Sequence, residues 1–459
     1  MNVTSFCALC VLLVLGKYLR VKVRLFQRLY LPSSVLGGLL GLVLVQLAGR
    51  TWPGPGFVES VTYGWRGLPG FLISIVFAAL FLGVTIPPVR SIWRKAGPQL
   101  AYGQIVAWGQ YTVAILLAAG VLAHFVRPGG EPLSPAFGAI IPVGFEGGHG
   151  TAGGMAEVFA RYGWEAGRDF GLASATVGIV SAIVVGMALV NWAVRRGYVS
   201  KLRRVEEMSE SGIVGFYPVD ERPPAGRQTV SADSIDTLAL HLAIIGVAVL
   251  IGYFIKEGLQ WLEVALSGQS VFFTGFPLFP LAMIGGLLVQ LFLSRVPRVN
   301  PVDHGLMQRI SGTALDFLVV AAVSTIRLSA ITEGWLPFVV VICGGILWNV
   351  FCLMWLARRL LPDFWFERGI AEMGQSMGVT ATGLLLLRVV DPQSETEAPS
   401  AFGYKQLLHE PFMGGGLWTA SAVPLIYLWG PWAVWLVSLG ALAGWLVVWA
   451  ACFRPRGSA

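Results

Sequence analysis

Long apolar runs recur along nearly the whole chain and are separated by short polar segments. A helix needs about 20 apolar residues to cross the roughly 30 Å of hydrocarbon in a bilayer, and most of these runs have about that length. They predict an all-α polytopic membrane protein with about eleven transmembrane helices. We place the spans at about 3–20, 33–49, 68–86, 99–124, 170–194, 236–262, 274–294, 310–331, 335–360, 405–428 and 431–453.

Two segments, 135–162 and 367–391, break this pattern because polar residues and many glycines interrupt their apolar positions. Backbone that is not helical cannot face lipid, since its N–H and C=O groups would lack hydrogen-bond partners. We therefore interpret each segment as a re-entrant hairpin that enters and leaves the membrane on one side. One such break in each half of a hydrophobic chain is typical of a transporter with inverted-topology repeats and a binding site near the midplane.

The basic residues of the short loops predict the orientation. Cytoplasmic loops carry an excess of Lys and Arg, and all the basic loops fall on one side if the N-terminus lies outside and eleven helices cross. The C-terminus is then cytoplasmic. The basic segments are 17–28, 90–97, 195–204, 295–309, 358–359 and 454–456.

The order and sidedness of the predicted spans divide the chain into four parts. Each half has four spans, a hairpin and one further span, and the two halves begin on opposite sides, so we predict inverted-topology repeats with two opposed hairpins. Residues 1–195 form the first repeat and 234–428 the second. A cytoplasmic linker, 196–233, joins them, and 429–459 add one helix and a tail.

The composition agrees with a membrane protein: 55% of the residues are hydrophobic and 12% are charged, against about 25% charged in soluble domains. The net charge of +7 lies in short loops that orient the helices, so we expect lipid and no nucleic acid as a partner. The sequence contains no nucleophile elbow, zinc-protease motif or phosphate loop. We predict no enzyme activity and no prosthetic group.

Charged groups at membrane depth are costly and are therefore candidates for function. Glu146 and Asp316 are candidate cation ligands, and the hydroxyls of Thr380 and Thr382 add neutral oxygens that suit a hard cation such as Na⁺. The structural alternatives are a hydrogen-bonded acid at Asp316 and, at Glu146, an acid at the wet mouth of the hairpin. For the glycines, the alternative is close packing of helices.

His149 and Arg388 are the basic candidates. His149 is flanked by glycines and could bind a carboxylate or carry a proton, although a lone histidine is often structural. Arg388 could pair with a substrate carboxylate, or it could instead extend to the interface or pair with Asp391. Arg327 lies near a span end and is interpreted as an interfacial anchor.

The first hairpin also carries a family resemblance. Residues 147–152 (Gly-Gly-His-Gly-Thr-Ala), with 157–159 and 162–163 after them, resemble the first hairpin of the bacterial sodium–glutamate symporter family. Residues 15–17, 31–32 and 35–40 resemble its first two spans. Residues 378–382 (Gly-Val-Thr-Ala-Thr) stand where that family has a glycine followed by Thr-Pro-Thr.

The resemblance implies a Na⁺-coupled carrier for L-glutamate, with two opposed hairpins and an elevator-type movement. We also expect a homodimer, and the resemblance to a bacterial family implies a bacterial inner membrane. Carried over by position, the hairpin residues would bind substrate and sodium. The candidate substrate residues are Gly147, Gly148, His149, Gly150, Thr151, Gln375, Ser376, Gly378 and Arg388.

Three departures from the family pattern concern the substrate. Ala381 replaces the middle proline, and an apolar run up to Arg388 replaces a polar stretch. Glu146 stands where the family usually has a small neutral residue, and its charge would repel an acidic substrate unless a cation or proton neutralises it. The alternatives are therefore a proton-coupled carrier using Glu146 and His149, or a passive channel or sensor.

Overall fold

The computed structural model describes residues 2–51, 55–85, 87–125, 132–199, 216–217, 219–231, 233–295, 301–392 and 394–454. These residues are mostly helical, and within them eight helices are long and apolar enough, by length and composition alone, to cross a membrane. One of these eight is α19 (Trp365–Val390), which is bent back on itself. Four shorter apolar helices accompany them: Ser33–Ala48, Leu68–Ala79, Phe279–Leu293 and Leu417–Trp429. The prediction of an all-α polytopic membrane protein is confirmed.

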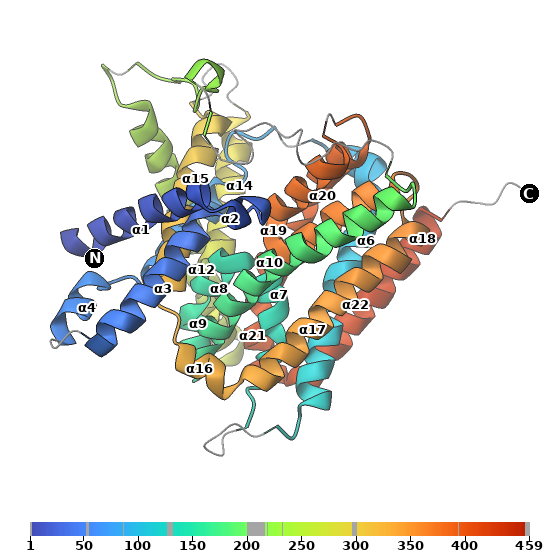
Figure 1. Ribbon diagram of the computed structural model, residues 1–459, viewed down its shortest axis with the longest axis horizontal. Helices are drawn as coiled ribbons and strands as arrows, with labels where there is room; N and C mark the ends of the chain where they lie inside the picture. The colour runs from blue at the N-terminus through green and yellow to red at the C-terminus, as the bar shows by residue number, and fades with distance from the viewer. Residues whose placement is uncertain are drawn as a thin grey trace, which may run out of the picture.

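Six helices form a first group, which we call the scaffold group; it lies on the left of Figure 1. The backbones of neighbouring helices in this group approach each other closely at glycines, as expected where helices pack without a hydrophobic driving force. A Cβ on Gly16 would lie 2.6 Å from the backbone nitrogen of Gly37, and one on Gly252 would lie 2.5 Å from Ala282. The helices are α1 (Val3–Lys22), α3 (Ser33–Thr51), α5 (Leu68–Ala79), α12 (Thr237–Ser267), α14 (Phe279–Leu293) and α15 (His304–Ser324).

The remaining long helices form a second group, the hairpin group, on the right of Figure 1. Two tryptophans of the last helix are hydrogen-bonded to neighbouring helices. Trp435 Nε1 donates to the carbonyl of Thr112 at 3.1 Å, and Trp449 Nε1 donates to the carbonyl of Leu360 at 2.7 Å. The group contains α6 (Val89–Ile115) with η1 (Leu116–Val121), α10 (Ala166–Arg195), α17 (Trp335–Phe351) with η5 (Cys352–Ala357) and α18 (Arg358–Leu360), and α22 (Pro431–Cys452).

The segment predicted as the first hairpin folds into three short helices, α7 (Ile140–Phe145), α8 (Gly148–Gly154) and α9 (Ala156–Arg161). The chain reverses between α7 and α8. A Cβ on Gly171 of α10 would touch both Ala152 and Val143, which are nine residues apart. The two limbs therefore run side by side along α10.

The second hairpin lies within α19 (Trp365–Val390), which is bent back on itself. Gly378 and Val379 have non-helical backbone angles, with φ of −148° and +64°. A Cβ on Gly374 would lie 2.8 Å from the Cα of Gly383, whereas nine residues of straight helix span about 13 Å. The limbs before and after the kink are about 20 Å and about 16 Å long, and both are too short to cross a bilayer. The chain reversal agrees with the prediction, and the side of entry stays a prediction.

The prediction of one continuous helix at 405–428 was wrong. The structure has α20 (Ala398–His409) and α21 (Leu417–Trp429), with a break at 410–416. Pro411 has no backbone N–H to donate, and Gly415 adopts a φ of +92° that favours glycine. The two helices continue in one direction along α6, since His409 contacts Gln104 and Trp418 contacts Trp108.

Other boundaries differ by a few residues. The span expected at 310–331 begins at His304, because the side chain of Asp303 accepts a hydrogen bond from the backbone N–H of Leu306 and caps the helix. Residues 328–333 form the separate helix α16 (Leu328–Glu333). Much of the predicted linker 196–233, namely 200–215, 218 and 232, lies outside the described residues.

Candidate functional site

The tips of the two hairpins meet. Gly148, at the first tip, has a φ of +67°, and a Cβ there would lie 2.5 Å from Cγ1 of Val379 at the second tip. Both tips also reach α10, where a Cβ on Gly178 would overlap the carbonyl oxygen of Met377 and touch Phe145. A glycine at 148 therefore lets two turns of backbone, one from each half of the chain, pack together.

The break between α20 and α21 forms a third side of this meeting point. A Cβ on Gly415 would overlap Oγ1 of Thr151 in the first hairpin. From the second hairpin, Thr380 Oγ1 donates to Glu410 Oε2 at 3.3 Å. Three interruptions of helix thus converge, and helix ends expose unpaired N–H and C=O groups that can bind ions and polar ligands.

Glu146 lies at this point, and its side chain is fully buried. Its Oε1 accepts a hydrogen bond from Ser376 Oγ at 3.3 Å and lies 3.4 Å from Nε2 of His409. Gln104 lies on the other side of the imidazole, with Nε2 3.2 Å from Nδ1 of His409. Glu146 Oε2 is buried and has no hydrogen-bond partner among the described residues.

A second acid–base pair lies beside the second hairpin. Lys405 Nζ lies 2.6 Å from Glu372 Oε1 and donates to Gln375 Oε1 at 3.0 Å. Gln99 Nε2 donates to the other carboxylate oxygen of Glu372 at 3.0 Å. The side chains of Lys405 and Glu372 are both 0% exposed. Because an unpaired charge at such depth is costly, each member stabilises the other.

The structure brings most of the predicted site residues together at the tips. They come from both hairpins, as the sequence predicted: Glu146, Gly147, Gly148, His149, Thr151, Gln375, Ser376, Gly378 and Thr380. Thr382 lies one turn further along the second limb and donates to the carbonyl of Gly378. Gly150 faces the scaffold group, where a Cβ would touch Ile73 and Leu315.

Two of the hairpin side chains have distinct surroundings. His149 is 4% exposed and its Nε2 lies 2.9 Å from Oγ1 of Thr176 on α10. This hydrogen bond anchors the first hairpin to α10. His149 therefore has a structural contact, as the structural interpretation of a lone histidine expects. Thr151 Oγ1 is buried with no partner among the described residues, so it is free to bind a ligand.

Asp316 and Arg388 do not join the other predicted residues. Asp316 is exposed on α15 of the scaffold group, beside Ser34 of α3. Arg388 is exposed near the end of the second limb of α19. It lies nine positions after Val379, which corresponds to roughly 13 Å of helix. The structure therefore places neither side chain at the meeting point of the tips.

The sequence analysis missed the buried basic and amide groups that surround the tips. Lys405 and His409 lie inside a stretch that was counted as an ordinary span, although a lysine and a histidine within a span are themselves a functional signal. Gln99 and Gln104 project from α6. Their contacts with α19 and α20 join residues far apart in the chain, so only the fold reveals them.

An ionic contact links the two groups away from the tips. Arg327, before α16, contacts Asp169 at 2.8 Å and Glu165 at 3.1 Å, both near the start of α10. Burial lowers the pKa of the Arg327 guanidinium, but these two carboxylates outweigh burial and raise it. Next to it, Arg168 donates to Thr325 Oγ1 at 2.7 Å. The start of α10 is thus held against the end of α15.

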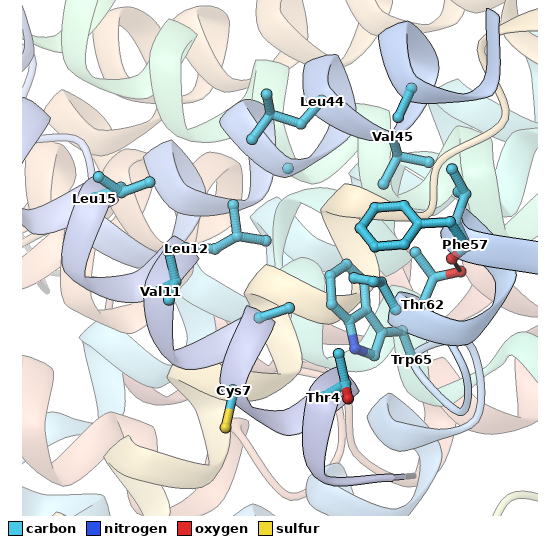
Figure 2. Close-up of a pocket in the computed structure, with 15 residues that line it drawn as sticks. Thr4, Cys7, Val11, Leu12, Leu15, Leu44, Val45, Phe57, Thr62 and Trp65 are labelled. Carbon is cyan, nitrogen blue, oxygen red and sulfur yellow. Dashed lines mark hydrogen bonds between the residues drawn. The ribbon is translucent and has the colours of Figure 1, made fainter. Parts of the chain in front are cut away.

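Cavities also lie away from the tips. A cavity of about 450 Å³ lies between α1, α3 and α4 (Pro55–Val61), and its lining is almost wholly apolar, including Leu12, Val45 and Trp65 (Figure 2). It suits no charged substrate. A cavity of about 420 Å³ lies beside the first hairpin and is lined by Glu157, Arg161 and Lys256.

Comparison with known proteins identifies the family of the chain. The family model described as sodium/glutamate symporter matches residues 1–384, which include the first hairpin and the tip of the second. Lys405, His409 and the break at 410–416 lie beyond the matched residues. No curated protein and no solved structure matches the chain. The match covers most of the chain, and this protein therefore belongs to the sodium/glutamate symporter family and is a multi-pass membrane transporter.

Proposed function

We propose that this protein is a Na⁺-coupled symporter that carries glutamate or a related amino acid or small carboxylate by alternating access. The observation that carries the proposal is the meeting of two hairpin tips, one from each half, against the broken helix α20–α21. A charged substrate at membrane depth needs N–H groups, carbonyls and hydroxyls that are not already paired. Helix breaks supply these groups at the same place.

Oxygen atoms at the tips support sodium as the coupling ion. Na⁺ is a hard cation that prefers oxygen ligands. Glu146 Oε2 and Thr151 Oγ1 are both buried and without partners among the described residues. A carboxylate near the substrate would oppose an anion by Coulomb repulsion, so a cation bound at Glu146 would also make room for a carboxylate substrate.

The division into two groups supports an elevator-type movement. The first hairpin meets the scaffold group through glycines: Gly153 lies against Pro69, and Gly154 against Ile73. Such a surface is smooth beside the first hairpin, so one group can slide along the other once the contacts of Arg327 with Asp169 and Glu165 break. The scaffold group would stay fixed in a homodimer, with the N-terminus outside and the C-terminus in the cytoplasm of a bacterial inner membrane.

The test is uptake of labelled L-glutamate into proteoliposomes under an inward Na⁺ gradient, a proton gradient or neither. We expect accumulation under the Na⁺ gradient that unlabelled glutamate competes away. Competition by a panel of other amino acids and small carboxylates identifies the preferred substrate. Equal uptake with and without any gradient would contradict coupling and would favour a passive pathway.

A second candidate is proton-coupled transport of another organic anion, and the Glu146–His409 pair favours it. The two side chains lie 3.4 Å apart and are fully buried, so one proton can be shared between them. In this case a proton gradient alone drives uptake, and Glu146→Gln removes the dependence on pH. Uptake that follows Na⁺ and ignores the proton gradient excludes this candidate.

A further inference from the structure

The ammonium of Lys405 occupies a pocket built from oxygen atoms. Glu372 Oε1 lies 2.6 Å and Gln375 Oε1 3.0 Å from Nζ. Gln99 is hydrogen-bonded to the same carboxylate, and its own Oε1 is buried without a partner among the described residues. Carboxylate and amide oxygens are the ligands that bind alkali and alkaline-earth ions in proteins. The donor set thus suits a small cation as well as an ammonium.

The surrounding helices leave room for this ammonium at one glycine. A Cβ on Gly103 of α6 would lie 2.5 Å from Cε of Lys405 and 2.7 Å from Glu372 Oε1. Any larger residue at 103 would displace the pair. The ring of Phe402 lies 5.7 Å from Nζ and covers it on another side. The lysine is therefore enclosed by three helices, α6, α19 and α20.

The pocket adjoins the transport site. Gln375 and Ser376 are neighbours in α19, and Ser376 donates to Glu146. Lys405 stands one helical turn before His409, the partner of Glu146. Two carboxylates therefore lie close together in the interior, and Lys405 supplies a positive charge that never leaves the protein. An ordinary structural ion pair is the alternative.

We propose that Lys405 is a tethered cation that fills a Na⁺ site formed by Glu372, Gln375 and Gln99. The protein then binds no Na⁺ at this position and couples one cation fewer than these ligands would otherwise hold. Removing the amine leaves a buried carboxylate that needs a counter-charge. Na⁺ enters the vacated space and restores neutrality. This inference rests on the proposed function for its transport readout alone, because ion binding is measured without transport.

The first test is the thermal stability of purified protein as NaCl replaces choline chloride at constant ionic strength. A ligand that binds only the folded state raises the melting temperature with its concentration. Between about 1 and 100 mM Na⁺ we expect Lys405→Met to gain roughly 5 °C relative to wild type. Lys405→Met/Glu372→Gln, which has no unpaired carboxylate, gains nothing over wild type. Lys256→Met, which changes a lysine on the second cavity, is the matched control.

Two outcomes overturn the proposal. One is a sodium dependence of Lys405→Met equal to that of wild type, which means that a proton or no ion replaces the amine. The other is loss of folded Lys405→Met in both salts. If the variant is fragile, the proposal requires that it be recovered folded from NaCl and lost from choline chloride, which gel filtration of the extracted protein reports.

Transport gives the second readout. In proteoliposomes the initial rate of the Lys405→Met variant should depend on Na⁺ with an exponent one larger than that of wild type. An unchanged exponent with altered thermal stability assigns the Na⁺ to a structural role and overturns the coupling part of the proposal. No uptake by wild type under any gradient contradicts the proposed function, while the thermal test still decides whether Lys405 fills a cation site.

Discussion

The two hairpins meet at their tips but are held in different ways. The first hairpin contains glycines and small residues, and it lies between the two groups, against α10 on one side and against α5 and α15 on the other. The second hairpin lies inside the hairpin group and is anchored by the fully buried pair of Glu372 and Lys405. The first hairpin therefore depends on close packing at small residues, and the second depends on a buried ion pair.

This difference predicts that the hairpins respond to different substitutions. Added volume should damage the first hairpin, where backbones touch. Changes of charge should damage the second, where the ion pair cannot be solvated. The following predictions compare the two, beginning with the largest expected effect on transport or stability.

The largest loss of transport is expected for Gly148→Val. The residue has a φ of +67°, and its Cβ would lie 2.5 Å from Val379. A β-branched residue in this conformation costs about 1–3 kcal/mol, and the clash separates the tips. Uptake should fall below detection while the protein still inserts and elutes as a single species. Gly440→Val is the control, because a Cβ there meets no described atom within 4 Å. Normal uptake by Gly148→Val would remove the first tip from the site.

The largest loss of stability is expected for Glu372→Gln. The substitution leaves the ammonium of Lys405 buried with only amide oxygens near it, and breaking a buried pair costs about 3–5 kcal/mol. Thermal unfolding in detergent measures the change. The double variant Glu372→Gln/Lys405→Met should recover much of the loss, because it leaves no unpaired charge. If the stability lost in the double variant equals the sum of the two single losses, Glu372 and Lys405 do not stabilise each other.

A smaller effect is expected for Gly103→Ala, which adds one methyl group beside the ion pair. The new Cβ would lie 2.5 Å from Cε of Lys405, and overpacking of this kind costs about 1–3 kcal/mol. The melting temperature should fall and the sodium dependence of transport should change with it. Gly403→Ala on α20 is the comparison, since a Cβ there meets no described atom within 4 Å. Equal melting temperatures for the two variants would show that the pair can shift without cost.

The smallest effect is expected for Asp316→Asn. The sequence made Asp316 a candidate cation ligand, but the structure places it exposed on α15 beside Ser34. A substitution away from the site usually changes free energies by less than about 0.5 kcal/mol, so the sodium titration of uptake should shift by about twofold or less. A shift of tenfold or more would return Asp316 to the cation site and would require movement of α15 toward the tips.

Much of the architecture could be predicted from the sequence because lipid imposes local rules. Backbone groups must be paired within each segment and apolar runs must match the bilayer, so the helices and both chain reversals follow from hydropathy and glycine content. The break at 410–416 was missed because Leu417 to Trp429 alone reads as a continuation of an apolar span. Pro411 and the three glycines after Met413 were its local signal.

The sequence by itself determined the helical membrane class, the positions of the hairpins and the family, since these depend on composition and on short motifs such as residues 147–152. Only the tertiary structure decided which charges face each other. Lys405 could have paired with any nearby acid, and its choice of Glu372 depends on how α19 folds back beside α20 and on the space at Gly103. Electrostatic partners in a low-dielectric interior are fixed by distances of a few ångströms, and such distances between remote residues are a property of the fold.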